Sequence, residues 1–132
     1  MCKKRDLILV EKYESTGTPV GRHTFVVIDD SNGEIQGVSY DIVCNVLSSF
    51  KDEEQRKRKL SYPGNFPITA SDTSVKEGNS KEGYIKADQF YYFKKEMIDY
   101  QVIGSINEEK FNLLMQFIND GNFDIIDITD NI

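Results

Sequence analysis

The stretch TFVVIDDSNGEIQGVSYDIVCNVL, residues 24–47, decides the fold class. It begins with a β-branched and aromatic run at residues 24–28, and the Asn32-Gly33 pair that follows favours a hairpin turn because both residues tolerate positive φ. Residues 34–40 then alternate polar with apolar side chains, and residues 41–47 form a run typical of a buried strand. The stretch therefore predicts three consecutive strands with a turn after the first.

Further strand-like runs lie on both sides of this stretch. Residues 7–10 are apolar, residues 84–93 are rich in aromatic side chains, and residues 101–106 form one more short run. Residues 14–21 collect two Gly, a Pro and small hydroxyl residues, which predicts a loop long enough to move. Residues 69–83 are polar and rich in Ser and Gly, which predicts a surface connection. The chain thus carries about six predicted strands.

Two segments have helical sequences. Residues 51–59 include eight charged side chains, with acids ahead of bases, so we expect an exposed helix. Residues 107–119 are the expected C-terminal helix, because Asn107 suits the N-cap and two acidic residues follow it. Apolar side chains recur at helical spacing within this segment: Phe111, Leu114, Met115 and Ile118. Gly121 is the expected C-cap.

The length and composition fit one globular domain. The chain has 132 residues, 39% of them hydrophobic, with 8 Phe and 7 Tyr to supply a core. The predicted fold class is therefore mainly β with helices (α+β), as a single domain over residues 1–132. Residues 121–132 alternate apolar side chains with Asp, and we interpret them as an acidic tail.

The net charge of −6 on its own disfavours a nucleic-acid partner, because Lys and Arg drive phosphate binding. The charge is unevenly distributed, however. Residues 1–62 contain ten basic and ten acidic side chains, whereas residues 63–132 contain six basic and twelve acidic ones. The only dense basic run lies at residues 56–59. An overall acidic chain can therefore present a local basic face.

Several classes of protein are disfavoured by the sequence. No stretch approaches the roughly 20 apolar residues of a membrane span, and the charged start leads into too short an apolar run for a signal peptide. Cys2 and Cys44 are expected to be reduced thiols, since no Cys/His cluster has zinc-site spacing. No phosphate loop or nucleophile motif supports a small-molecule enzyme. We therefore expect a cytoplasmic protein without a metal or other cofactor.

Five segments carry a resemblance to a known family. They are residues 4–10, residues 21–28 with the sequence GRHTFVVI, residues 42–48 with the sequence IVCNVLS, residues 83–90 and residues 103–109. In their order and rough spacing, the chain resembles the MazF/PemK (Kid) toxin family as a distant member. The resemblance implies a small SH3-like, PemK-type β-barrel.

The function that this resemblance implies is cleavage of single-stranded RNA. Members of the family are metal-independent endoribonucleases of toxin-antitoxin modules, usually dimeric, and a cognate antitoxin protein blocks the RNA groove. Such cleavage needs a base for the 2′-OH proton, an acid for the leaving 5′ oxygen and positive donors for the charge that develops on the phosphate. We therefore expect an RNA-binding homodimer with an antitoxin partner.

The resemblance also implies the site residues. The family places its catalytic Arg directly before a Pro that opens the second strand, and its Thr or Ser where a later strand ends. Here Thr24 occupies the Pro position, His23 lies where the Arg is expected, and Arg22 lies one residue earlier. The expected catalytic residues are Arg22, His23, Ser48 and Ser49. An imidazole is a suitable general base or acid near neutral pH, although His23 could instead only bond its neighbourhood, and the serines could cap a strand end.

The basic run is the expected RNA-binding element, with its side chains Arg56, Lys57, Arg58 and Lys59 on phosphates and Tyr62 and Phe66 as stacking platforms. The alternative is a solvated helix face paired with acids at i,i+4. The aromatic residues 90–93 are expected in the core or an interface. The acidic tail is expected to solubilise the chain, or else to cover the basic groove.

A second function remains open for the same fold. An Arg displaced by one strand position points to the opposite face unless the preceding loop compensates. The alternative function is therefore that of a catalytically inactive MazF-like barrel that binds protein or nucleic acid, with a mobile element as its source. Its acidic second half would suit a basic protein surface.

Overall fold

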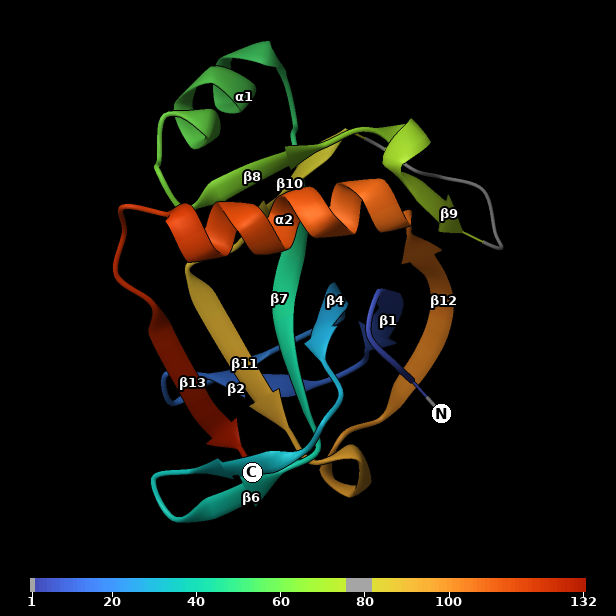
Figure 1. The fold of residues 1–132 in the computed structure, drawn as a ribbon, viewed down its shortest axis with the longest axis vertical. Coiled ribbons are helices and arrows are strands. Elements are labelled where there is room, and N and C mark those ends of the chain that lie inside the picture. Colours follow the sequence, from blue (N-terminus) through green and yellow to red (C-terminus); the bar gives the residue numbers. More distant parts are fainter. Residues whose placement is uncertain (1, 76–81) are drawn as a thin grey trace.

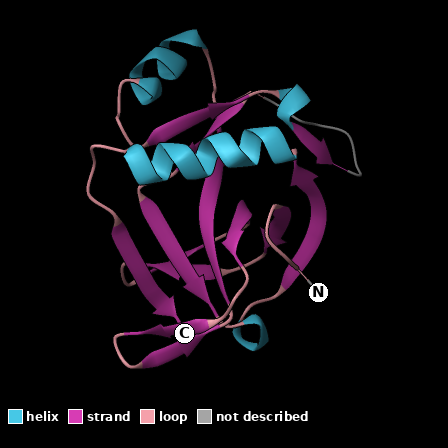
Figure 2. Cartoon of the chain, in the orientation of Figure 1, coloured by secondary structure: helices cyan, strands magenta, loops and turns pink. Residues whose placement is uncertain are grey.

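The computed structural model describes residues 2–75 and 82–132. Within these residues the chain is mostly β, with two α-helices and two short 3₁₀ turns, η1 (Ala70–Asp72) and η2 (Lys95–Met97), as Figure 2 shows. The expected mainly β architecture with helices is therefore confirmed. None of the helices in the described residues is both long and apolar enough to cross a membrane.

One curled sheet carries most of the strands, in the order β13-β11-β7-β4-β1-β12-β9. The bounds of these strands are β1 (Asp6–Val10), β4 (His23–Asp29), β7 (Ile42–Ser49), β9 (Thr73–Val75), β11 (Gln89–Phe93), β12 (Tyr100–Ile106) and β13 (Ile126–Asn131). All neighbours are antiparallel except β11 and β13. Two more strands, β8 (Asn65–Ile68) and β10 (Gly83–Lys86), extend the sheet where β10 pairs with the end of β7. Figure 1 shows that the sheet curls beneath the longer helix.

Two small hairpins flank this sheet: β2 (Tyr13–Ser15) with β3 (Thr18–Val20), and β5 (Gly33–Ile35) with β6 (Val38–Tyr40). Their turns hold Thr16-Gly17 and Gln36-Gly37 at positive φ, the backbone pattern that matches the strand twist of a two-residue hairpin. The predicted loop at residues 14–21 is therefore wrong. The predicted strand at residues 34–40 is also wrong, because the chain reverses at Gln36-Gly37 and not at Asn32-Gly33.

Residues 84–93 form two strands and not the single strand predicted. The chain turns between β10 and β11, where the backbone N–H of Ala87 donates to the carbonyl oxygen of Gly64 at 2.9 Å. Gly64 lies directly against the side chain of Asp88, so a Cβ at this position would clash. The predicted surface connection at residues 69–83 contains η1 and β9, and its residues 76–81 lie outside the described ones.

Both helices lie within a residue or two of their predicted positions. The exposed helix α1 (Glu53–Leu60) begins at Asp52, whose carboxylate accepts the N–H of Gln55, and it has no buried residue. The longer helix α2 (Glu108–Asp120) is capped by Asn107, whose side-chain oxygen accepts the N–H of Lys110 at 2.8 Å. Figure 1 shows α2 lying across the curled sheet, with α1 apart from it beyond β8.

The sheet has an apolar core on each of its faces, because its strands alternate side chains between them. The hairpin-side core lies toward β2 and includes Val10, Tyr13, Phe25, Val27, Cys44, Tyr91 and Phe93. The helix-side core lies beneath α2 and includes Leu7, Val26, Val43, Ile85, Tyr92, Phe111 and Leu114. The aromatic residues of β11 thus belong to the core, as expected.

The acidic tail predicted at residues 121–132 is wrong for half of that segment, because residues 126–131 form strand β13. Ile128 is buried there, and the pairing of β13 with β11 is parallel. Its acids bind other parts of the fold: Asp127 accepts the hydroxyl of Tyr92 at 2.8 Å, and Asp130 accepts the N–H of Gly17 at 2.6 Å. The alternation of Ile with Asp therefore reflects a half-buried strand.

The buried side chain of Asn131 joins this last strand to the β2–β3 hairpin. Its Oδ1 accepts the N–H of Glu14 at 2.8 Å, and its Nδ2 donates to the carbonyl oxygen of Glu14 at 2.9 Å. We expect Asn131→Ala to lower the free energy of unfolding by about 1–3 kcal/mol, because both backbone groups of Glu14 lose their partner. Urea denaturation measures this change. The exposed Asn122→Ala is the matched control, and equal losses in the two variants would contradict the expectation.

Candidate functional site

A cavity of about 490 Å³ gathers the predicted catalytic residues. Arg22, His23 and Thr24 line it from the start of β4, and residues 47–49 line it from the end of β7. Helix α1 contributes Gln55 and Lys59, and the remaining lining residues are Leu9 and Tyr84. The cavity is therefore formed where two central strands end beside the exposed helix. We call it the β4–β7 cavity.

The register of the sheet explains why His23 and Ser48 meet. β4 and β7 run antiparallel with Phe25 opposite Val46, and continuing this register by two residues sets His23 opposite Ser48. On its other side β7 pairs with β10, which places Tyr84 opposite Ser48. Opposed residues share a face of the sheet, so the imidazole, the hydroxyl and the phenol belong to one surface.

Gly83 allows this close approach of β10 to β7. A Cβ built on Gly83 would overlap the carbonyl oxygen of Ser48, so no larger residue fits without separating the strands. Phe50, directly after β7, stacks on Tyr84 with ring centroids 5.2 Å apart and an interplanar angle of 29°. An aromatic pair therefore borders the serine end of the cavity.

The half-buried ring of His23 has a defined tautomer when neutral. Its Nδ1 lies 3.3 Å from the carbonyl oxygen of Gly21, and because a carbonyl can only accept, Nδ1 carries the proton. The lone pair is then on Nε2, which makes this nitrogen a base. The ring of Tyr13 contacts His23 edge to face at 5.9 Å. Burial, and secondarily the neighbouring Tyr91, raise the pKa of Tyr13 to about 12, so the phenol of Tyr13 is uncharged at physiological pH.

Arg22 lies just before β4 and is largely exposed. Its Nη2 is 3.3 Å from Oε1 of Glu11, a surface ion pair with 65% of the Arg22 side chain accessible. Such a pair contributes little to stability and leaves other N–H groups of the guanidinium free to bind an anion. Because Arg22 precedes the regular strand, strand alternation does not place it on the face opposite His23, and both residues line the cavity.

The basic run divides into residues with different positions. Lys59 lines the cavity, while Lys57 and Arg58 are exposed and do not. Arg56 pairs with Glu53 at 3.6 Å, three residues earlier on α1, and with Glu82 at 4.0 Å. In the described part of the chain, no ion pair has the i,i+4 spacing expected for this helix. Of the four predicted RNA-binding residues, Lys59 is thus the one that the structure brings to the catalytic candidates.

The predicted stacking platforms are not at this site. Phe66 is 7% exposed, packs against Phe117 and has Lys110 over its ring, so it is not available for stacking. Tyr62 is 53% exposed but does not line the cavity. The aromatic residue that does line it is Tyr84, which sequence reasoning did not select. The one signal for Tyr84 in the sequence was its position directly after Gly83, in a segment that carries the family resemblance.

The charge of the cavity differs from that of the whole chain. Its described lining includes Arg22, His23 and Lys59 with no carboxylate, although the net charge of the protein is −6. A smaller hollow of about 150 Å³ continues it, since both are lined by Thr24, Leu47, Ser48 and Ser49. The arrangement offers cationic and hydroxyl donors around a single base, which is suited to binding a phosphate. No protein-family model matches the chain, and no curated protein matches its sequence.

Proposed function

We propose that this protein is a MazF/PemK-like endoribonuclease that cuts single-stranded RNA without a metal ion, with the β4–β7 cavity as its active site. The observation that carries the proposal is the meeting of Arg22, His23, Lys59 and two serines in one cavity free of carboxylates among its described lining residues. The PemK-type, SH3-like barrel is part of the proposal. It is supported by a curled, mostly antiparallel sheet covered by the C-terminal helix.

The proposed reaction is an internal displacement at phosphorus. Nε2 of His23 accepts the proton of a ribose 2′-OH, the 2′ oxygen forms a bond to the adjacent phosphorus, and the bond from phosphorus to the 5′ oxygen breaks. The ammonium of Lys59 gives a proton to that leaving oxygen. Arg22 and the hydroxyls of Ser48 and Ser49 donate hydrogen bonds to the phosphate oxygens, whose negative charge grows in the transition state. The products are a 2′,3′-cyclic phosphate and a 5′-hydroxyl.

The biological setting belongs to the same proposal. We infer a toxin of a toxin-antitoxin module that acts on cytoplasmic RNA as a homodimer. A cognate antitoxin would inhibit it by covering the β4–β7 cavity. An acidic antitoxin segment would suit the cationic lining.

The test is cleavage of a mixed-sequence single-stranded RNA by the purified protein in EDTA. We expect products with 2′,3′-cyclic phosphate ends, and an Arg22→Ala variant about 10²-fold slower because one donor to the transition state is lost. Arg58→Ala, an exposed Arg on α1 outside the cavity, is the matched control and should cut at the wild-type rate. A folded wild-type protein that leaves RNA intact, and whose expression does not arrest growth, would refute the proposal.

The ion pair between Arg22 and Glu11 favours a second candidate function. A guanidinium held by a carboxylate at 3.3 Å is partly neutralised, which suits a barrel that binds nucleic acid without cutting it. The same experiment separates the two candidates. An inert wild-type protein that still shifts labelled RNA in a gel, and loses that binding in Lys59→Ala, would establish the binding module.

A further inference from the structure

We propose that a second hollow, at the start of β1, holds a phosphate of the same RNA strand whose scissile phosphate occupies the β4–β7 cavity. This inference rests on the proposed function and adds an anchoring site to it. The hollow has a volume of about 440 Å³. Its polar and charged lining residues are Lys3, Lys4, Arg5, Asp6, Ser74 and Ser105. We call it the N-terminal hollow.

The backbone fixes the cations of this hollow in place. Asp6 accepts the N–H of Lys3 on its carboxylate at 2.9 Å, while its own N–H donates to the carbonyl oxygen of Lys3 at 2.9 Å. This closed turn holds Arg5 at a φ of 79°, a conformation that non-glycine residues rarely adopt. The N–H of Arg5 donates to Val27, and its Nε donates to the carbonyl oxygen of Ile106 at 3.2 Å. Arg5, held by these bonds, lines the hollow.

The charges of the hollow are not equally available. The hydroxyl of Ser31 is the main cause that lowers the pKa of the Asp29 carboxyl, and the charge of nearby Lys4 contributes to the same shift. The N–H of Lys4 also donates to Asp30 at 3.0 Å. Lys3 and Arg5 form no ion pair in the described part of the chain. The one acid in the lining, Asp6, is 8% exposed and already bonded to backbone, so Lys3 and Arg5 dominate the local charge.

Two hydroxyls lie opposite each other beside these cations. Ser105 of β12 pairs with Ser74 of β9, and both line the hollow. Gly104 lets the two strands approach, since a Cβ there would clash with the carbonyl oxygen of Ser74. Cationic N–H groups and two adjacent hydroxyls are hydrogen-bond donors that suit the oxygens of a phosphate group. The chemical class of the ligand is therefore a phosphodiester.

The two sites are close enough to bind one strand. Leu9 lines the β4–β7 cavity and Arg5 lies four residues earlier, which at ~3.3 Å per residue along β1 separates the sites by about 13 Å. A single strand of a few nucleotides therefore spans this distance. The 150 Å³ hollow adjoins both sites: it shares Ser48 and Ser49 with the cavity and Val75 with the N-terminal hollow.

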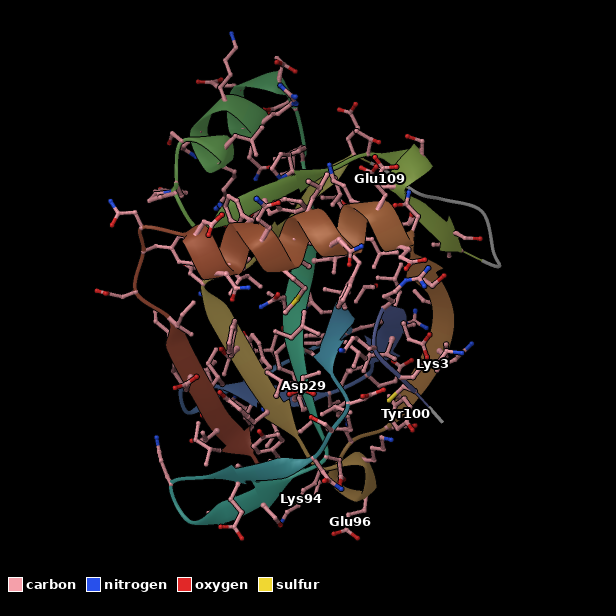
Figure 3. The ribbon with its side chains drawn as sticks, in the orientation of Figure 1. Lys3, Asp29, Lys94, Glu96, Tyr100 and Glu109 are labelled. Carbon is pink, nitrogen blue, oxygen red and sulfur yellow. The ribbon has the colours of Figure 1, made fainter. Side chains whose placement is uncertain are left out.

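The test uses Lys3→Ala/Arg5→Gly, in which glycine suits the positive φ of position 5. Lys94→Ala/Lys95→Ala is the control that removes the same charge, and Figure 3 shows Lys94 beside η2 and well away from Lys3. Fluorescence anisotropy measures binding of 2′-O-methylated 12-mer and 3-mer RNA, which cannot be cut. Circular dichroism melting verifies that both variants fold.

The expected result depends on strand length. Losing two phosphate contacts should weaken 12-mer binding about 25-fold at ~0.1 M salt and reduce the slope of log affinity against log salt by about 1.4. The double variant should bind the 3-mer as tightly as wild type does. The control variant should match wild type with both RNAs. If the wild-type protein binds and cuts RNA but the double variant binds the 12-mer as tightly as wild type, the second site is refuted and the proposed function stands. Equal weakening of 3-mer and 12-mer would also overturn the second site, and absence of RNA binding by wild type would overturn both proposals.

Discussion

His23→Ala is expected to slow RNA cleavage by about 10²–10⁴-fold, because it removes the only imidazole of the chain from the β4–β7 cavity. The contact between Nδ1 and the Gly21 carbonyl leaves Nε2 as the base, so the loss should appear in kcat more than in KM. Single-turnover cleavage of a labelled RNA in EDTA measures the rate. Added imidazole should restore part of it, since the vacated space can hold the free ring.

A general base has a signature that a structural histidine lacks. His23→Gln keeps a polar group beside Tyr13 and should be as slow as the alanine variant while retaining RNA binding. If His23→Gln cuts at the wild-type rate, His23 is not the base and the mechanism fails.

Leu114→Ala should lower the free energy of unfolding by about 2–5 kcal/mol, the cost of a cavity where a large buried side chain is truncated. Leu114 is fully buried on α2 and belongs to the helix-side core, so its loss weakens the attachment of the helix to the sheet. Whole domains are stable by only about 5–15 kcal/mol, so the variant could lose half of its stability. Urea unfolding followed by far-ultraviolet circular dichroism gives the difference.

Leu113 provides a control one residue away on the same helix. Its side chain is 48% exposed, and Leu113→Ala keeps the helix propensity and removes the same atoms. We expect a change within about 0.5 kcal/mol for this variant. Similar losses for the two leucines would show that α2 does not cover the sheet as described.

Features determined by neighbouring residues could be predicted from the sequence. Asn107 caps α2 as expected, and the apolar spacing correctly selects Phe111 and Leu114 as the buried side of the helix. The charged side chains of residues 51–59 were sufficient to predict the exposed helix α1. Strands β1, β4, β7 and β12 lie close to their predicted ranges, because their β-branched and apolar runs are unambiguous.

Features determined by distant partners could not be predicted in this way. The Asn32-Gly33 pair is a strong turn signal, but the reversal occurs at Gln36-Gly37, where Tyr40 packs on Tyr92 and fixes the β5–β6 hairpin. The strand character of residues 126–131 depends on β11, more than thirty residues earlier, and on the bond from Tyr92 to Asp127. Local patterns do not contain such partners.

The candidate site shows the same division. The family resemblance selected Arg22, His23, Ser48 and Ser49, all of which line one cavity, and the register of β4 and β7 sets His23 opposite Ser48. It could not separate Lys59 from its basic neighbours, because that depends on how α1 is oriented against the sheet. Phe66 looked available for stacking but is covered by α2, a contact between segments some fifty residues apart.

The parallel pairing of β13 with β11 has a consequence for the order of folding. Between these strands the chain crosses the sheet to form β12 and returns through α2, so β13 can pair with β11 only after this crossover has been made. Asn131 and Asp130 then provide the bonds that hold the β2–β3 hairpin. Because Tyr13 of that hairpin contacts the ring of His23, we expect the proposed catalytic base to become fully ordered only once β13 has paired with β11.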